Sequence, residues 1–478
     1  MEHRRIIGLD LGIASAHTAR VLDETGKVVT KRRALPTVES LGALEEAALA
    51  GAPEGTVLEV VMEPTGPAWL PIAVFFSRRG HQVFRVPSAV AHDMRKVFSR
   101  QAKSNTIDAN ALARLAIVTP EILRLLTFEG PEAAALDRRV RACDRLTQQA
   151  SVHKVRIKDL VRQLLPNSPL HGDLGLADLA VLEVCGDPRE LVRWGEERVC
   201  ELIVAASTGH QGAGRAKEWL ASAHGALELY GDHVGVAFSD LAAEVATEVR
   251  LLRSITDELA RHETAREEHY VKVDPTELAR SLPGLRNVGG PVLVATMGDP
   301  ARFPSASHFR SFTGLAPKAS ETGNTDRKGQ PMSKAGNALL RTTLVRAADW
   351  ARKQDPQLAR IYFVQMTERG KTHLGALCVV AANLAERAWL VMHRGTPYVI
   401  CDVDGTPVDA WQAKAIIAER YTVTEETRQR RRSRKGGKAP QEVLTGHLQS
   451  HTQGVDRTRR PSPAPTPARS GAPVNQPA

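Results

Sequence analysis

The periodicity of apolar and polar positions changes repeatedly over the first 125 residues of the chain. Runs of β-branched and other apolar residues, the pattern of buried strands, lie at 5–13, 56–66 and 81–87. Segments with the periodicity and end signals of helices lie at 38–51, 67–80 and 104–118. Residues 17–33 form a hairpin pattern that turns at 24–26. Because strands alternate with helices, we predict an α/β domain over 1–125 with a largely parallel central sheet.

The pattern changes at 130–166, which is long, charged and periodic and has no Gly or Pro in its interior. A second segment of the same kind lies at 238–270. Two such helices predict an antiparallel pair or a coiled-coil arm within 126–275, which is a candidate dimerisation element. Residues 167–237 between them are interpreted as a helical insertion.

From residue 276 the pattern predicts a third, mostly helical unit that extends to 415. Its most apolar segment, 375–392, is interrupted by Asn383, Glu386 and Arg387. We therefore interpret this segment as a buried helix and not as a membrane span. Beyond 424 the chain is first basic and then rich in Pro, Ala and Ser, so we predict a disordered tail over 424–478.

Composition indicates a class of partner only in outline. Lys and Arg number 64 against 54 Asp and Glu, which gives a net charge of +10 and a pI near 9.5. This charge favours a polyanionic partner, with nucleic acid ahead of a membrane surface. The five cysteines form no C-x-x-C pair, so neither a zinc knuckle nor a disulfide framework is indicated. The first residues show no signal peptide, and we expect a cytoplasmic, nucleoid-associated protein.

Three acids lie where the predicted elements would bring them together. Asp10 interrupts an apolar strand, where a charge is costly unless it is paired or binds a metal. Glu63 ends a second strand, and Asp108 lies near the start of a helix with Asn105 three residues earlier on the same face. Sites in parallel α/β sheets form beyond the carboxyl ends of the strands. Oxygen ligands gathered there suit Mg²⁺ or Mn²⁺, which supports phosphodiester chemistry.

Each acid also has a purely structural interpretation. Asp10 could stabilise a turn, Glu63 could end its strand, and Asp108 could be a first-turn acid that the helix dipole favours. For Glu63 and Asp108 only the combination with Asp10 and the basic charge favours a metal site. The motif "GLDLG" also opens sugar-kinase and actin-like ATPase domains, but "DVDGTP" at 402–407 lies too near the end of the ordered chain to be their second phosphate loop.

Several motifs resemble one family of proteins. "GLDLG", "MEPTG" and "KSNTIDANALA" are similar to the blocks of the RuvC-like DEDD domain of the IS-one-ten family of insertion-sequence transposases. The segment from "LPGLRNVGGPVLVATMGD" to "SKAGNALLRTTLVRAA" resembles the second conserved domain of that family. The two blocks cover roughly 5–118 and 276–400 in the expected order.

The resemblance implies an RNase H-like (RuvC-like) N-terminal domain, a coiled-coil linker and a mostly helical C-terminal domain. It also implies a recombinase that acts on the DNA ends and the target of its own element, guided by a structured RNA. Asp10, Glu63 and Asp108 match the first, second and fourth acids of the family's metal site, and Asn105 takes the place of the third. An Asn side chain offers a carbonyl oxygen to a metal but no negative charge, and it cannot act as a base.

The family's nucleophilic serine precedes a glycine after "GLAP", but this chain reads "GLAPKASETGNTD". Thr322 therefore matches the serine by position, and Ser320 lies two residues earlier on the same loop. Either hydroxyl becomes a nucleophile when it is activated, and both also fit ordinary polar loop residues.

Two further features point to nucleic-acid binding. "LPGLRNVGGPVLVATMGD" resembles a helix-hairpin-helix, whose backbone N–H groups hold a phosphate. The loop and helix that follow carry clustered cations, which suit phosphate neutralisation: Lys318, Arg327, Lys328, Lys334, Arg341 and Arg346.

We therefore predict an oligomeric DNA transposase that uses Mg²⁺ or Mn²⁺ and a Thr322 or Ser320 hydroxyl. The alternatives are a RuvC-like nuclease that uses a metal-activated water, a sugar-kinase-like ATPase, and a decayed transposase that binds nucleic acid without cutting it.

Overall fold

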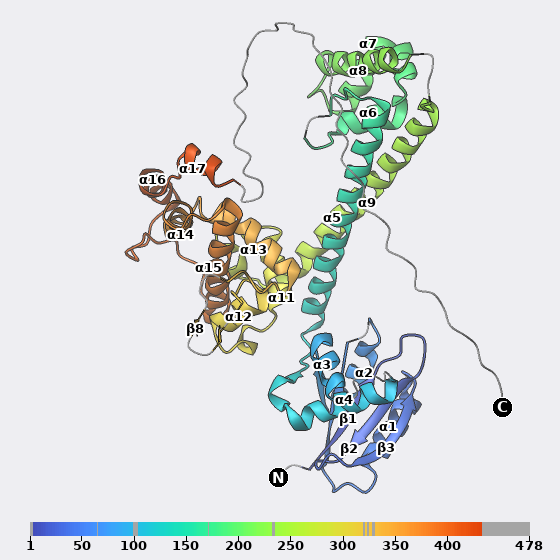
Figure 1. Cartoon of the computed structure of the whole chain (residues 1–478), viewed down its shortest axis with the longest axis vertical. Coiled ribbons are helices and arrows are strands. Elements are labelled where there is room, and N and C mark those ends of the chain that lie inside the picture. The colour runs from blue at the N-terminus through green and yellow to red at the C-terminus, as the bar shows by residue number, and fades with distance from the viewer. Residues whose placement is uncertain are drawn as a thin grey trace, which may run out of the picture.

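The computed structural model describes residues 3–64, 66–98, 104–170, 172–231, 235–318, 321–322, 325–326 and 330–432. They form an N-terminal α/β unit, a two-helix arm with a small helical unit at its far end, and a helical C-terminal unit beside the arm (Figure 1). One mixed sheet combined with many helices confirms the predicted α/β plus α composition.

The N-terminal unit is built on a six-stranded sheet. Its strands are β1 (Arg4–Asp10), β2 (His17–Leu22), β3 (Val28–Ala34), β4 (Val57–Met62), β5 (Gln82–Arg85) and β6 (Arg124–Leu125). They lie in the order β3-β2-β1-β4-β5-β6, in which β1, β4 and β5 are parallel and the other pairings are antiparallel. The expectation of a largely parallel sheet is therefore wrong. The antiparallel β2–β3 hairpin was predicted, but β2 also pairs antiparallel with β1, because the short connection over 11–16 leaves no room for a crossover.

Helices cover both faces of this sheet. They are α1 (Val38–Leu49), α2 (Trp69–Arg78), α3 (Ser88–Phe98), α4 (Asn105–Val118) and the 3-10 helix η1 (Pro120–Ile122). Side chains alternate between the two faces along β1. Ile7 and Leu9 pack in the core beneath α1 and α2, whereas Ile6 packs in the core beneath α3 and α4. Asp10 therefore belongs to the face that α4 covers.

α4 approaches β1 most closely at Gly8. A Cβ atom on Gly8 would lie 2.0 Å from the carbonyl oxygen of Ala109 and 2.4 Å from the backbone nitrogen of Ala113. Both neighbours are backbone atoms of a helix and cannot move aside individually, so glycine is required here. Ser104 caps the same helix, because its hydroxyl accepts a hydrogen bond from the Ile107 N–H (3.3 Å).

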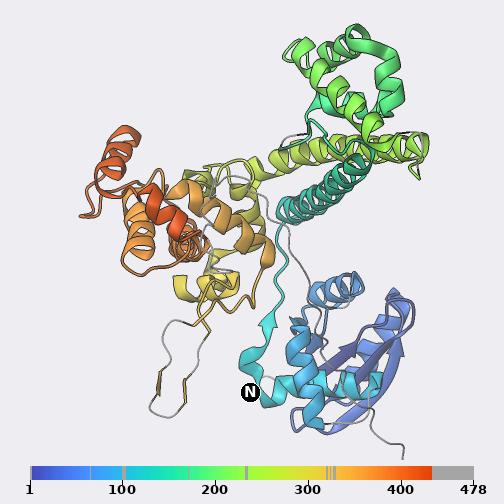
Figure 2. The same cartoon turned by 45° about the horizontal axis from the view of Figure 1, so that its top comes forward.

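The arm consists of α5 (Pro131–Leu164) and α9 (Phe238–Val273). Polar pairs join the two helices at three levels: Glu132 with His269, Arg139 with His262, and His153 with Glu248. The partner positions descend on α9 as they ascend on α5, so the helices run antiparallel along the length of the arm (Figures 1 and 2).

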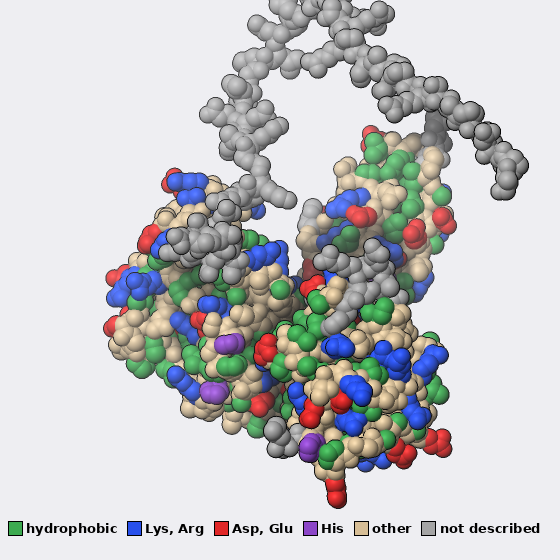
Figure 3. Space-filling view, turned by 60° about the horizontal axis from the view of Figure 1, so that its bottom comes forward, with side chains coloured by type: hydrophobic (Ala, Val, Ile, Leu, Met, Phe, Trp, Pro, Cys, Tyr) green, Lys and Arg blue, Asp and Glu red, His purple; other side chains and the backbone are tan. Residues whose placement is uncertain are grey.

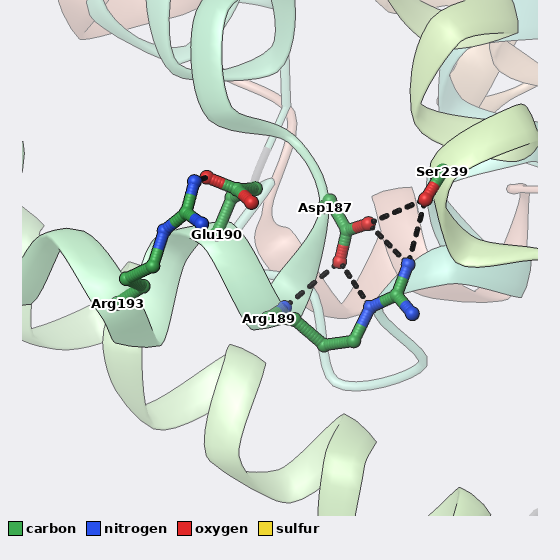
Figure 4. Close-up of polar contacts among 5 residues, drawn as sticks. All are labelled: Asp187, Arg189, Glu190, Arg193 and Ser239. Atoms are coloured by element: carbon green, nitrogen blue, oxygen red, sulfur yellow. Dashed lines mark hydrogen bonds and ion pairs between the residues drawn. The ribbon is translucent and has the colours of Figure 1, made fainter.

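The helical insertion is made of α6 (Leu176–Cys185), α7 (Pro188–Ala206) and α8 (Ala213–Tyr230), which pack around the fully buried Trp219. Asp187 caps α7 by accepting a hydrogen bond from the Arg189 N–H (2.9 Å), and its carboxylate also pairs with the Arg189 guanidinium (2.7 Å; Figure 4). Ser239, at the start of α9, contacts both side chains. This cluster therefore ties the insertion to the arm.

The C-terminal unit is mostly helical. Its elements are α10 (Leu278–Ser281), α11 (Gly289–Met297), the 3-10 helix η2 (Pro300–Arg302), α12 (Ala306–Thr313), β7 (Glu321–Thr322), β8 (Thr325–Asp326), α13 (Ala338–Ala351), α14 (Pro356–Thr367), α15 (His373–Arg394), α16 (Ala410–Arg420) and α17 (Glu425–Arg430). Leu136 and Val140 of α5 and Tyr270 of α9 belong to its core, so the unit is anchored on the arm.

α15 is the central helix of this unit and packs against α12, α13 and α14. Over the described ranges it is the one helix long and apolar enough to cross a membrane, and half of its most apolar stretch is buried inside the protein. Ala381, Leu384 and Ala385 lie in the core of the unit. These contacts fit the interpretation of this segment as a buried helix.

The chain remains helical beyond the point where a disordered tail was expected. Thr424 caps α17 by accepting a hydrogen bond from the Thr427 N–H (3.3 Å), and Val423 is buried in the C-terminal core. The prediction of disorder is therefore wrong for 425–430. Residues 433–478 lie outside the described ranges.

Replacing Gly8 with Ala is expected to destabilise the N-terminal unit by about 3 kcal/mol, because the added methyl group would force α4 away from β1. Amide hydrogen exchange of the full-length protein, followed by mass spectrometry, would show faster exchange in peptides from β1 and α4.

Gly42→Ala is the matched control. This glycine lies inside α1, and a methyl group added to it would meet no atom within 4 Å. Ala should therefore stabilise the helix by about 0.5–1 kcal/mol. Equal exchange rates in Gly8→Ala and the wild type would contradict the proposed packing constraint.

Candidate functional site

Two carboxylates lie at the ends of adjacent parallel strands. Asp10 ends β1, and Glu63 directly follows β4. Leu9 pairs with Met62 in the parallel register, so Asp10 and Glu63 occupy the next pair of positions. Val61, two residues before Glu63, packs in the core beneath α4, as Ile6 does on β1. The alternation of side chains therefore assigns both acids to the face that α4 covers.

The first turn of α4 lies over the same edge of the sheet. Gly8 meets Ala109 and Ala113, while Gly26, in the turn between β2 and β3, faces Ile117 near the other end of the helix. α4 therefore runs antiparallel to β1, and its N-terminal turn reaches the edge where β1 ends. That turn carries Asn105, which is exposed, and Asp108, which is half-buried.

Asp108 has a cationic partner from a neighbouring helix. Nη1 of Arg95, on α3, lies 3.4 Å from Oδ1 of Asp108, and both side chains are about one fifth exposed. The other terminal nitrogen of Arg95 contacts Nδ1 of His92 (2.5 Å). The Asp108 carboxylate is therefore oriented by Arg95 within the unit.

The predicted acids share one region without forming a closed ligand cluster. In the part of the chain that the structure describes, no three His, Cys, Asp or Glu side chains gather closely enough to hold one metal ion. Asp10 and Glu63 nevertheless provide hard oxygen donors from adjacent strand ends, which is the donor chemistry that Mg²⁺ and Mn²⁺ prefer. Asp108 could act as a third donor only if its ion pair with Arg95 were broken or shared with the metal ion.

A buried histidine, which the sequence did not single out, supports the loop after Asp10. His17 is 2% exposed, and its Nδ1 accepts a hydrogen bond from the Gly12 N–H (3.2 Å). Burial lowers the pKa of the imidazole below its ordinary value of 6.5. A neutral ring is required for Nδ1 to accept, so the position of Gly12 depends on the protonation state of His17. In the sequence, the only indication of this role was a polar residue at a position of β2 whose side chain is expected to point into the core.

The hydroxyl candidates lie on a separate element. Ser320 is outside the described residues, and of Thr322 only the backbone in β7 is described, paired with Thr325 in β8. The loop that carries this hairpin is fixed at its base, where a Cβ on Gly336 would lie 2.4 Å from the Phe312 carbonyl oxygen. Figure 2 shows the β7–β8 hairpin projecting from the C-terminal unit, and in Figures 1 and 2 it lies apart from the sheet. The two predicted halves of the site are thus not joined within one chain.

The predicted cations of the C-terminal unit fall into three sets. Lys318, Lys334 and Arg346 are exposed, whereas Arg327 and Lys328 lie outside the described residues. Arg341 donates from Nη1 to the backbone carbonyls of Lys334 (3.1 Å) and Thr313 (3.4 Å). Its guanidinium therefore holds the base of the hairpin loop together, a role that sequence spacing did not indicate.

The helix-hairpin-helix-like segment, 282–299, directly follows α10 and consists of a turn and α11. Gly289 and Gly290 at the start of α11 are buried, and a Cβ on Gly290 would lie 3.0 Å from the Arg280 side chain. Arg286 in the turn before them is exposed. The two glycines thus serve close packing at the start of this helix.

Two family matches cover about half of the chain. Residues 7–166 match the DEDD transposase domain of the IS110 type, and residues 276–363 match the Transposase IS116/IS110/IS902 family. The first match includes the acidic edge and α5, and the second includes the β7–β8 hairpin and α13.

Similar proteins include two insertion-element proteins over most of their length. The insertion element IS110 uncharacterized 43.6 kDa protein of Streptomyces coelicolor is 27% identical over 82% of this chain and 95% of its own length. The insertion element IS900 uncharacterized 42 kDa protein of Mycobacterium paratuberculosis is 24% identical over 82% of this chain and 96% of its own. A pilin gene-inverting protein of Moraxella lacunata is 25% identical over 25% of this chain and 38% of its own.

The two matched domains and the similar proteins show a DNA-processing enzyme of the transposase and recombinase class. The chain belongs to the IS110 family of insertion-sequence transposases, as the motifs implied. Membership implies that it binds DNA, and its DEDD domain suggests the use of a divalent metal ion.

Acid is expected to loosen the loop after β1 because His17 must be neutral to accept the Gly12 hydrogen bond. The folded pKa lies below 6.5 and the unfolded pKa near it. Protons therefore bind the unfolded chain first, and this contribution to stability is present above pH 6.5 and is lost as the pH falls. Hydrogen exchange of peptides spanning 9–17, corrected for intrinsic rates, should rise between about pH 7 and pH 5.

His17→Asn separates this effect from general acid destabilisation. The Asn carbonyl can accept the same N–H but does not titrate in this range. The pH dependence in the loop should therefore be flattened in the variant. An unchanged acid response would show that another group is responsible.

Proposed function

We propose that this protein is the site-specific DNA recombinase of an insertion sequence. Its N-terminal unit would then be an RNase H-like (RuvC-like) domain over 1–125, joined by the arm over 126–275 to a transposase domain over 276–415. The observation that carries the proposal is the register that sets Asp10 opposite Glu63 at the sheet edge beneath α4. The strand order β3-β2-β1-β4-β5 and the two family matches support it.

Asp10 and Glu63 would hold Mg²⁺ or Mn²⁺, with Asp108 and the carbonyl oxygen of Asn105 as further donors. When bound, such an ion supplies Lewis-acid stabilisation of the charge that develops on a phosphodiester. The role of the chain is to hold the donors: the register orients Asp10 and Glu63, and the Gly8 contact fixes α4 above them. Arg95 balances the charge of Asp108 when no cation is near.

The attacking group in this proposal is the hydroxyl of Thr322, or alternatively that of Ser320. Its oxygen would bond to the scissile phosphorus while the bond to one deoxyribose oxygen breaks, and that oxygen would take up the proton that the hydroxyl loses. One phosphoester is exchanged for another, so no oxidant or nucleotide is consumed. Attack by a second DNA hydroxyl would reverse the step and complete the strand exchange.

The distance between the acids of the sheet edge and the hydroxyl candidates of the β7–β8 hairpin implies an oligomer. Because the β7–β8 hairpin lies apart from the sheet of its own chain, we infer that it acts on DNA held by the acids of another subunit. The long antiparallel arm offers a surface for assembly into a dimer or tetramer. Binding of a structured guide RNA and association with the nucleoid complete the proposal, and they accord with the net charge of +10.

Binding without cleavage is the second candidate function. Asn105 carries no charge where the family has an acid, and Arg95 already engages Asp108. Both features weaken the attraction for a cation. A decayed transposase that retains nucleic-acid binding would show this combination, whereas a nuclease that uses water would need neither hydroxyl.

The proposed reaction is tested by incubating the full-length protein with Mg²⁺, element-derived RNA and labelled element-end DNA. A covalent protein–DNA adduct is expected, and Thr322→Ala should abolish it if the position matched by the family's serine is the nucleophile. Denaturing electrophoresis resolves the adduct. Loss in Ser320→Ala alone would assign the role to Ser320.

Thr325→Ala is the matched control, because Thr325 pairs with Thr322 across the same hairpin. It should retain the adduct. Cleavage without an adduct would identify a nuclease, and binding without cleavage would identify a decayed enzyme.

Arg95→Gln is expected to tighten Mn²⁺ binding about three- to tenfold, because it removes a positive charge beside Asp108 that is only partly screened. Isothermal titration of the full-length protein measures this affinity. Lys96→Gln is the control, since Lys96 contacts the exposed Asp93 on the same helix (3.9 Å). An unchanged or weaker affinity in Arg95→Gln would place Asp108 outside the metal site.

A further inference from the structure

A cationic cavity of about 420 Å³ lies beside the acidic edge, between α4 and the outer strands β2 and β3. Four of its nine lining residues are cationic and none is acidic, the cations being Arg20, Lys31, Arg32 and Arg33. Asn105 and Thr106 from the first turn of α4 complete the wall that faces them. The sequence placed these cations in an ordinary hairpin, so no role was assigned to them.

The cations of this cavity have no carboxylate partners among the described residues. Nε and Nη1 of Arg20 are buried and lack a hydrogen-bond partner within the described ranges. A buried guanidinium nitrogen without a partner is costly, and the cost is removed when an anion binds. Lys31 and Arg33 pair in register with Arg20 and Thr18, so they extend from the same face of the sheet.

The cavity adjoins the acids directly. Thr18 lines it and pairs with Asp10, whereas Arg20 pairs with Gly8 beneath α4. Neighbouring strands lie about 4.8 Å apart, so Arg20 is one strand and Lys31 two strands away from β1. A chain of phosphates that crosses the strand ends from β4 toward β3 would meet the acids first and then the cations. Figure 3 shows Lys and Arg side chains, with some Asp and Glu among them, on the visible surface of the N-terminal unit.

The structure assigns a function to this arrangement: we propose that Arg20, Lys31 and Arg33, with Asn105, bind a backbone phosphate of the DNA strand that is processed at Asp10 and Glu63. This inference rests on the proposed function, because it takes the strand at the acids to be DNA. The cavity holds the phosphate next to the scissile one and fixes the strand across the sheet edge. Such a contact is independent of base sequence.

Asn105 has a specific part in this subsite. Its carboxamide carries an acceptor and a donor, so the carbonyl oxygen can turn to the acidic edge while the NH₂ group donates to a phosphate. An aspartate at this position would repel the phosphate. The first-turn N–H groups of Asn105 and Thr106 lack partners inside the helix and add further donors. The neutral residue is thus suited to the boundary between a cation site and an anion site.

DNA is favoured over RNA as the occupant because the cavity lies next to the acids at which the DNA strand would be processed. Thr18, which lines the cavity, pairs with Asp10, where the DNA strand would be cut. RNA is kept as an outcome of the test.

The binding test uses the full-length protein in EDTA with a short fluorescein-labelled DNA duplex of arbitrary sequence, followed by fluorescence anisotropy at several salt concentrations. Arg20→Ala is expected to weaken binding about tenfold, the effect of removing one charge-assisted contact. It should also lower the slope of log K against log salt by about 1. Asn105→Asp should weaken binding in the same direction.

Arg78→Ala is the matched control. Arg78 is an exposed cation of the same unit on α2, which packs on the opposite face of the sheet. Its removal should leave both affinity and slope unchanged within twofold. If Arg78→Ala and Arg20→Ala had equal effects, the cavity would contribute only general surface charge, and the proposal would be overturned.

A photo-crosslinking residue in place of Lys31 gives a local readout. In a mixture of DNA and RNA of matched sequence, crosslinking to DNA supports the proposal, whereas crosslinking mainly to RNA or to neither overturns it. The test needs no metal and no cleavage. A Lys31 crosslink without any adduct in the activity test would contradict only the recombinase proposal, and an adduct without a Lys31 crosslink would contradict only the phosphate subsite.

Discussion

The packing of α4 on Gly8 is the contact on which the organisation of the N-terminal unit depends. It brings helix backbone within about a van der Waals contact of strand backbone, which no other residue at position 8 would permit. The acids at the ends of β1 and β4 lie on one side of this contact, and the first turn of α4 lies over them. The same contact leaves β2 and β3 to form the wall of the cationic cavity. One glycine therefore determines the distance between the acidic edge and the helix, and the width of the cavity beside them.

Cations beside the acidic edge would reduce the repulsion between its carboxylates and the phosphates of a DNA strand. Carboxylates that bind a metal repel the phosphates of an approaching strand, and the bound ion offsets this only where it lies. Opposite unit charges about 8 Å apart attract by about 2 kcal/mol at an effective dielectric near 20. Cations on β2 and β3 would therefore compensate the acids at the scale of one nucleotide. A neutral Asn105 between the two groups adds no charge to the metal site, but it also does not repel a phosphate. Asn105, which takes the place of an acid in the metal site, also fits a position between a cation site and an anion site.

The sequence predicted those parts of the fold that local patterns determine. The hairpin of β2 and β3, the helices α1, α2 and α4, and the long helices of the arm all follow from apolar periodicity and from end signals at Gly, Pro and Ser104. The directions of the other strands were predicted less well, because the alternation of strands and helices did not indicate that β1 pairs antiparallel with β2 and β5 with β6. α3 was not predicted, since its middle is as polar as a loop. Pairings between elements were invisible: Arg95 with Asp108, His17 with the Gly12 N–H, and Arg341 with two carbonyls all depend on tertiary packing.

The division of the proposed chemistry between two units has a physical consequence for its control. The hairpin that carries the proposed hydroxyl joins its own unit at a base where Gly336 packs closely and Arg341 donates two hydrogen bonds. The acids are held by the sheet register and by α4. In the proposed mechanism, association of chains on DNA would bring the two halves together, and a free protomer would be protected from cutting DNA because its acids and its hydroxyl candidates lie on separate units.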